Sequence, residues 1–204
     1  MTQKHRLSYL LLLNIVMILG LVSVGLYSNS LSVLAAGGDF IADSLAIALG
    51  LFAVNRRDVH KDEKATTYVA LINAAMLLII TVFVLVQAIL RLLNNSPEIN
   101  ALPVLIVALL SAISMGVGVL ILGKRAGNED LHMRSVFLDT ASDGLSAIGV
   151  AVVGLVILLT HNYYWLDSAA AVFISLIIGY GAIRLLIDVT KSFKTGQAVR
   201  IDDD

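Results

Sequence analysis

The stretch TTYVALINAAMLLIITVFVLVQAILRL (66–92) decides the fold class, because it is long, apolar and almost free of charge. Arg91 is its single charged residue and stands close to its end. A helix that spans a bilayer needs about 20 mainly apolar residues, whereas a strand of a membrane barrel needs about 10 with alternating polarity. The stretch therefore predicts a transmembrane helix.

Further stretches of similar length and composition fill the rest of the chain. They are residues 7–26, 31–54, 101–123, 133–159 and 165–190. Hydrophobic residues make up 58% of the 204 residues and charged residues only 14%, against about 25% charged residues in a soluble domain. The first run is too long for the apolar part of a signal peptide, and no A-x-A-like cleavage site follows it. We predict an all-α membrane protein with six transmembrane helices.

The charged residues predict the orientation in the membrane. All Lys and Arg residues except Arg91 fall on one side of the predicted spans, so the positive-inside rule places the N- and C-termini in the cytoplasm. We expect one six-helix domain over residues 1–194. Residues 195–204 form a short polar tail, too small for a cytoplasmic domain. A compact chain of this kind best fits the inner (plasma) membrane of a bacterium, with lipid around it.

Charge and cysteine content exclude several function classes. The formal net charge of -1 gives no sign of a nucleic-acid partner, and the chain has no cysteine. Disulfides, thiolate metal sites and cysteine nucleophiles are thereby excluded. Nothing in the sequence indicates a resident cofactor.

Four aspartates interrupt the apolar stretches in two matched pairs. Asp39 and Asp43 lie in GGDFIADSLA (37–46), and Asp139 and Asp143 lie in VFLDTASDGL (136–145). A spacing of four residues puts both members of a pair on one helix face. Counted from the cytoplasmic ends of their spans, Asp43 and Asp143 both lie about 17 Å deep, at a rise of 1.5 Å per residue. The two pairs can therefore face each other near the middle of the membrane.

Placing an acid near the middle of the membrane costs free energy, so we expect the four aspartates to face the protein interior. Each Asp costs at least ~2.5 kcal/mol at the centre of a membrane helix. Like charges at short distance favour bound protons when the site is empty, and a divalent cation can displace those protons. A purely carboxylate site suits Mn²⁺, Fe²⁺ or Zn²⁺, with four oxygen ligands in a roughly tetrahedral arrangement.

Other interpretations of the four acids remain open at this point. They include structural hydrogen bonds between helices, a proton or sodium pathway, and an intramembrane cation or proton channel. An intramembrane aspartyl protease needs only two acids, and the segment TASDG (140–144) lacks the expected G-x-G-D motif. We therefore predict a protein that is not an enzyme.

Several segments resemble the cation diffusion facilitator (cation efflux) family. Residues 14–54 are similar to the first two helices of that family, with Asn14, the SNSL turn (28–31) and an acid four residues before a second Asp. TTYVALINAAMLL (66–78), LHMRSVFLDTASDGLSAIGVAVV (131–153) and YYWLDSAAAVFISLIIGYGAIRLL (164–186) resemble the third, fifth and sixth helices. The resemblance covers residues 10–190.

The resemblance implies a function and a set of ligands. Asp39, Asp43, Asp139 and Asp143 would bind the transported metal, and a homodimer would export it from the cytoplasm in exchange for protons. Many zinc-moving members carry histidine in place of Asp139, whereas manganese-moving members tend to carry Asp in the fifth helix. The transported ion is thus Zn²⁺ or Mn²⁺, with Fe²⁺ and Cd²⁺ as further candidates. Family members usually have a cytoplasmic metal-sensing domain after the sixth helix, which we expect this chain to lack.

Other ionisable residues are assigned secondary roles. The segment 55–65 contains Asp58, His60, Asp62 and Glu63, near where some family members bind a second metal, but its mixed charge favours a solvated loop. His132 is expected at the cytoplasmic mouth of the fifth helix. We expect Asp167, at the start of the sixth helix, to cap that helix or pair at the interface rather than to bind metal.

Overall fold

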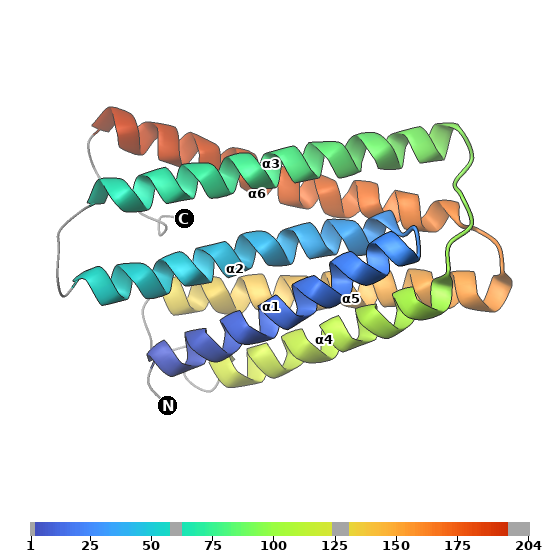
Figure 1. The fold of residues 1–204 in the computed structure, drawn as a ribbon, viewed down its shortest axis with the longest axis horizontal. Helices are drawn as coiled ribbons and strands as arrows, with labels where there is room; N and C mark the ends of the chain where they lie inside the picture. Colours follow the sequence, from blue (N-terminus) through green and yellow to red (C-terminus); the bar gives the residue numbers. More distant parts are fainter. Residues whose placement is uncertain (1–2, 58–62, 124–130, 196–204) are drawn as a thin grey trace.

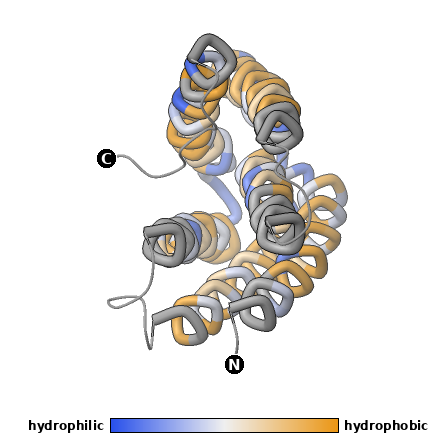
Figure 2. Tube along the Cα trace, turned by 90° about the vertical axis from the view of Figure 1, so that its left-hand side faces the viewer, coloured by the Kyte–Doolittle hydropathy of each residue, from blue (hydrophilic) through white to orange (hydrophobic). Residues whose placement is uncertain are grey.

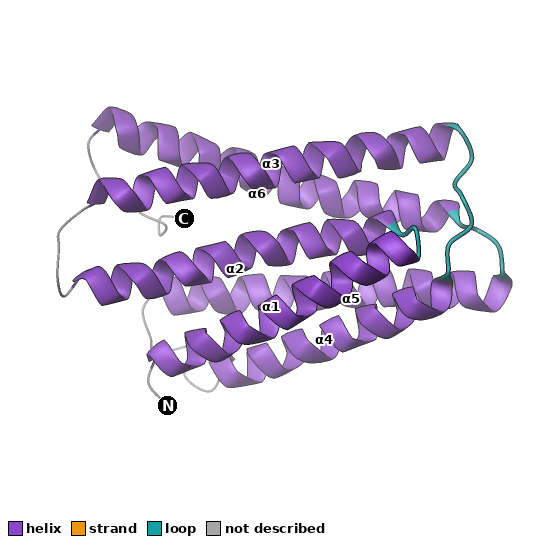
Figure 3. Ribbon diagram, in the orientation of Figure 1, coloured by secondary structure: helices purple, strands orange, loops and turns teal. Residues whose placement is uncertain are grey.

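Six α-helices make up almost all of the chain in a computed structural model that describes residues 3–57, 63–123 and 131–195. They are α1 (Gln3–Tyr27), α2 (Leu31–Arg57), α3 (Glu63–Leu93), α4 (Ala101–Gly123), α5 (Leu131–Thr160) and α6 (Trp165–Thr195). Figure 3 shows helices and connecting loops and no strand in this described part. The prediction of an all-α protein with six helices is confirmed.

Consecutive helices run antiparallel along the long axis of the molecule (Figure 1). The start of α1 and the end of α6 therefore lie at the same end of the bundle, and the α1–α2, α3–α4 and α5–α6 connections lie at the opposite end, called the loop end below. The most extensive contacts between helices are those of α4 with α5, α3 with α6, and α1 with α2. Helix α2 also packs against α3, α6 and α5, so it links the other helices at the centre of the fold.

Four helices are long and apolar enough to cross a membrane, when only the described residues are compared. The spans are Leu71–Leu93, Ala101–Leu120, Thr140–Thr160 and Trp165–Lys191, and Leu11–Tyr27 is a shorter apolar helix. Seen along the bundle, much of the chain is coloured as hydrophobic (Figure 2). Large side chains such as Ile79, Leu120 and Leu159 are 70% to 73% exposed. Hydrocarbon tails of lipid are the surroundings in which such exposure costs little.

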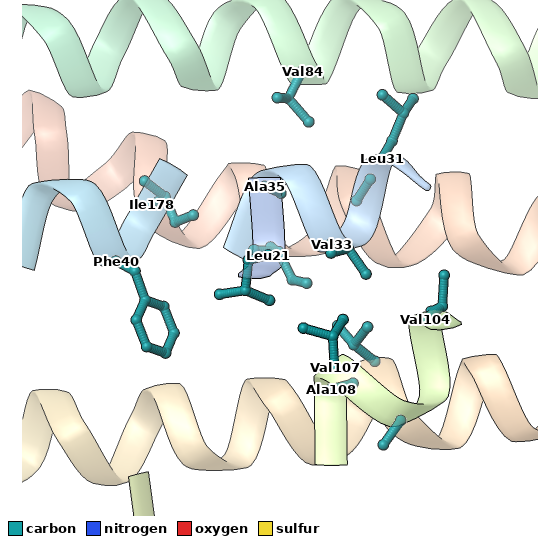
Figure 4. Packing of buried hydrophobic residues seen from close by; sticks show 14 of the residues in the cluster. Leu21, Leu31, Val33, Ala35, Phe40, Val84, Val104, Val107, Ala108 and Ile178 are labelled. Carbon is teal, nitrogen blue, oxygen red and sulfur yellow. The ribbon is translucent and has the colours of Figure 1, made fainter. Parts of the chain in front are cut away.

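The apolar core lies on both sides of α2. Val84 of α3 and Ile178 of α6 pack on one side, and Val104 and Val107 of α4 lie on the other (Figure 4). Val33 of α2 is completely buried among them. Since α2 is surrounded by protein over this stretch, polar groups on it can be held away from lipid.

A tight turn joins α1 to α2 at the loop end. Asn29 has a positive φ of 57°, a conformation that Asn adopts more readily than most residues at a helix C-terminus. The N–H of Ser30 donates to the carbonyl of Gly25 over 3.0 Å, and the Ser30 hydroxyl accepts the N–H of Val33 over 3.3 Å. Ser30 is therefore the N-cap residue of α2.

Candidate metal site

Helices α2 and α5 bring three of the four predicted aspartates together. One carboxylate oxygen from each of Asp39, Asp43 and Asp143 can be chosen so that all three lie within 4.8 Å of one another. All three side chains are half-buried. Residues far apart in the sequence thus meet in one acidic cluster between α2 and α5.

The fourth predicted ligand and the other ionisable residues considered above fall outside the part of the structure that is described at the level of side chains. Asp139 lies in α5, one helical turn before Asp143, but its side chain is not among those described. The same holds for Glu63 and His132, and for the loop residues Asp58, His60 and Asp62. Asp139 as the fourth ligand and a solvated loop at residues 55–65 both remain predictions.

Glycines next to the acids allow neighbouring helices to approach closely. A Cβ atom on Gly37 would lie 3.3 Å from Val22 Cγ2 of α1, and one on Gly38 would lie 2.8 Å from Ile80 Cγ2 of α3. These two glycines immediately precede Asp39, so α1 and α3 both press against α2 beside the first acid. On α5, a Cβ on Gly144 would lie 3.2 Å from the Cβ of Met115 in α4. Close backbone packing therefore holds both acid-bearing segments.

The spacing of the carboxylates suits a metal ion that draws them together. Two oxygens bound to one Zn²⁺ in tetrahedral geometry are about 3.4 Å apart, given bonds of about 2.1 Å. The three acids can reach that separation from distances of at most 4.8 Å by small side-chain rotations. Without a cation or protons, three carboxylates this close would repel one another. The cluster can therefore bind a divalent cation or protons.

A small crevice between α2, α3 and α6 also borders Asp39. Its lining includes Asp39, Thr81 of α3 and Ser175 of α6. The Ser175 hydroxyl is buried and has no hydrogen-bond partner among the described residues. Asp39 thus has polar neighbours on α3 and α6 in addition to the acids of α2 and α5.

The carboxylate of Asp167 caps a different helix from the one we expected. Its oxygens accept hydrogen bonds from the Leu31 N–H over 2.8 Å, the Ser30 hydroxyl over 2.6 Å and the Ser32 N–H over 3.4 Å. The Ser32 hydroxyl donates to it as well. All of these donors belong to the N-terminus of α2. Of the two expected roles, the described residues do not show the cap on α6, and the structure agrees better with pairing at the end of the bundle. Unpaired N–H groups and the positive end of the helix dipole favour a carboxylate there.

Arg91 of α3 holds the same connection from another side. Its guanidinium donates to the carbonyl and to the side-chain oxygen Oδ1 of Asn29, both over 2.6 Å. In the sequence, Arg91 is the one basic residue on its side of the predicted spans. Its partner Asn29, 62 residues earlier in the chain, could not be identified from the sequence. In the sequence, the hydroxyl residues Ser30 and Ser32 were the signal for a cap at the start of α2.

Comparison with known proteins agrees with this architecture. Residues 7–193 match the cation efflux transmembrane domain. The chain is 29% identical over 185 residues to the zinc transporter ZitB of Yersinia pestis, which covers 87% of this chain and 59% of that protein. It is 25% identical over 204 residues to a cadmium, cobalt and zinc/H(+)-K(+) antiporter of Bacillus velezensis, covering 94% and 64% of the two chains.

A third relative carries a broader name. The metal cation efflux system protein CzcD of Cupriavidus metallidurans is 28% identical over 159 residues, with coverage of 74% of this chain and 49% of that protein. The chain thus spans less than two thirds of the length of these relatives. Its apolar helices and bacterial relatives identify it as an integral protein of the bacterial plasma membrane. Because the matched region covers nearly all of its six helices, the chain belongs to the cation efflux family.

Proposed function

We propose that this protein is a secondary active transporter that exports a divalent transition-metal cation from the cytoplasm in exchange for protons. The ion binds between α2 and α5 to the carboxylates of Asp39, Asp43, Asp139 and Asp143, and protons replace it after release. The observation that carries the proposal is the meeting of three of these carboxylates within 4.8 Å in a chain of the cation efflux family.

Proton exchange follows from the chemistry of the ligands. A carboxylate must lose its proton to bind a metal, so binding releases protons and proton uptake favours release. In the membrane interior, a cluster that is always either protonated or metal-bound avoids the cost of several bare charges. The same groups therefore couple the two fluxes, whereas a channel would need no such alternation.

Zn²⁺ is the first candidate for the transported ion. The relatives from Yersinia and Bacillus are named for zinc, and the latter also for cadmium and cobalt. The all-carboxylate ligand set keeps Mn²⁺ as a second candidate, since carboxylates suit Mn²⁺ well and Zn²⁺ also accepts them. Flux measured with each ion separately distinguishes the two.

Orientation and assembly complete the proposal. The Lys- and Arg-rich end of the bundle, which carries the start of α1 and the end of α6, faces the cytoplasm. The loop end, with Arg91, faces outward. Two copies associate as a homodimer within the membrane.

Flux in proteoliposomes tests the function directly. Purified protein is reconstituted with a pH-sensitive dye and a metal-sensitive dye inside, and Zn²⁺, Mn²⁺, Fe²⁺ and Cd²⁺ are added in turn under an imposed pH gradient. We expect saturable uptake of metal, accompanied by proton movement in the opposite direction. Metal uptake without proton movement would indicate a channel, and no uptake of any of the ions would refute transport.

A further inference from the structure

We propose that Asp167 of α6 is a positioning residue for the metal site, because it sets the location of α2 and thereby of Asp39 and Asp43 opposite Asp143. This inference rests on the proposed function, which makes Asp39 and Asp43 metal ligands. The effect of Asp167 on the position of α2 can be tested without measuring metal flux. Asp167 lies at the loop end, away from the acidic cluster, and belongs to none of the ligand pairs.

The hydrogen bonds to the Asp167 carboxylate all come from one short segment at the start of α2. Its side chain is 0% exposed, and the hydrogen bonds described above all come from residues 30–32, which lie 135 to 137 positions earlier in the chain. A buried carboxylate needs several donors to offset its desolvation. Here residues 30–32 supply two backbone N–H groups and two hydroxyls, and the Arg91 guanidinium of α3 adds a favourable charge interaction. Moving the N-terminus of α2 away from α6 would break all four hydrogen bonds.

The tie acts on the same rigid element that carries the acids. Leu31 and Asp39 belong to one continuous helix and are eight residues apart, which corresponds to a rise of about 12 Å. If α2 slipped by one residue, Asp39 would move about 1.5 Å along the axis and about 100° around it. Such a movement would turn Asp39 and Asp43 away from Asp143.

Helix α5 itself does little to fix α2. The packing of α2 against α5 is much less extensive than its packing against α1, α3 and α6. Close packing at Gly37 and Gly38 holds α1 and α3 near α2, but the hydrophobic effect behind the other apolar contacts is not directional. Hydrogen bonds to Asp167 are directional, and they fix both the height and the rotation of α2 relative to α6.

The neighbouring residue offers a matched control. Ser168 is 1% exposed and its hydroxyl lies 3.2 Å from that of Ser96 in the α3–α4 connection. Replacing Ser168 with alanine also removes a buried polar contact of α6 at the loop end. It leaves every hydrogen bond to α2 in place.

Cysteine crosslinking measures the position of the acids. The chain contains no cysteine, so the pair Asp39→Cys with Asp143→Cys can be introduced without background and treated with a short thiol-specific crosslinker. A second pair, Met115→Cys with Gly144→Cys, reports on α4 against α5, which Asp167 does not touch. Each pair is combined with Asp167→Ala and, separately, with Ser168→Ala, in the full chain reconstituted in lipid.

We expect Asp167→Ala to slow crosslinking between positions 39 and 143 while leaving the pair at 115 and 144 unchanged. Ser168→Ala should change neither rate. In protein that keeps all four predicted ligands, Asp167→Ala should weaken Zn²⁺ binding, measured by calorimetry, by about tenfold or more. Loss of a contact that supports a ligand has an effect of this size at metal sites. Asp167→Glu, which keeps the carboxylate, should recover part of both effects.

The outcomes separate the two proposals. Equal crosslinking rates at positions 39 and 143 in Asp167→Ala and Ser168→Ala would overturn the positioning role. If Asp167→Ala does not yield folded protein, Ser30→Ala combined with Ser32→Ala removes the hydroxyl donors and keeps the carboxylate on the backbone N–H groups. An unchanged rate in that variant overturns the role as well. Failure of the unsubstituted protein to bind any of the metals refutes the proposed function and leaves the crosslinking result valid.

Discussion

A methyl group added to Gly38 would lie 2.8 Å from Cγ2 of Ile80, so α3 packs tightly against α2 directly beside Asp39. The side chain of Ile80 cannot easily turn away, because β-branched residues in helices strongly prefer one χ1 rotamer. The contact between these two residues therefore determines how far α3 lies from the acidic cluster.

Gly38→Ala should push α3 away from α2 and lower both stability and metal affinity. Overpacking of this kind costs about 1–3 kcal/mol. Thermal unfolding in detergent and Zn²⁺ calorimetry measure the two effects. Combining Gly38→Ala with Ile80→Ala should restore much of the metal affinity, since the clashing methyl group is removed, but not the stability, because Ile80→Ala leaves a cavity.

Gly116→Ala is the matched control for this substitution. A Cβ at Gly116 would have no atom within 4 Å, so we expect unchanged metal affinity and unchanged or slightly higher stability, because alanine favours helix by up to ~1 kcal/mol. An equal loss of stability in Gly38→Ala and Gly116→Ala would mean that the contact with Ile80 is unimportant.

Asp43→Asn and Asp143→Asn should each abolish metal flux and reduce Zn²⁺ affinity strongly. An amide cannot supply the negative charge or release a proton, so both binding and exchange fail. Ser142→Ala is a suitable control because Ser142 is an exposed neighbour on α5. Wild-type flux in both asparagine variants would exclude the acidic cluster as the transport site.

Metal binding should strengthen as pH rises. Protons and metal compete for the same carboxylates, so each proton released on binding makes the logarithm of the affinity constant rise by about one for each pH unit. Calorimetry in buffers with different ionisation enthalpies counts the protons. The count should fall in Asp43→Asn, and a pH-independent affinity would contradict carboxylate ligation.

Arg91→Gln should loosen the connection between α1 and α2. The two guanidinium hydrogen bonds to Asn29 are made at a partly exposed position, so we expect a loss of about 1 kcal/mol in unfolding free energy. Arg91→Lys keeps the charge but not the two-pronged geometry, and should lie between Arg91→Gln and the original protein. Thermal unfolding of the three proteins provides the comparison.

The helices and the acidic cluster were accessible from sequence for the same reason. Apolar length fixes a membrane helix, and a spacing of four residues fixes the shared face of Asp39 and Asp43. Equal depth in two helices then suggests that the pairs meet. These arguments use only distances along a single helix and the thickness of the membrane.

The partners of Asp167 were not accessible in this way. Its position in the first turn of α6 made a cap on its own helix the natural expectation, because that is the nearest set of free N–H groups. The actual donors lie on α2, and the choice depends on how α2 and α6 cross at the loop end. Neither helix contains that information alone, and the same is true of Gly38, whose neighbour Ile80 lies on α3.

The distance along the chain between the two halves of the acidic cluster has a consequence for synthesis in the membrane. Asp43 is made 100 residues before Asp143, which corresponds to about 5–20 s at a rate of roughly 5–20 residues per second. During that interval, α2 must enter the bilayer, paired with α1 through the short connection at residues 28–30, while α5 does not yet exist. Asp39 and Asp43 enter at the lowest cost as neutral, protonated acids. If the proposed function holds, the site therefore carries protons first and can bind a metal ion only after α5 has been made.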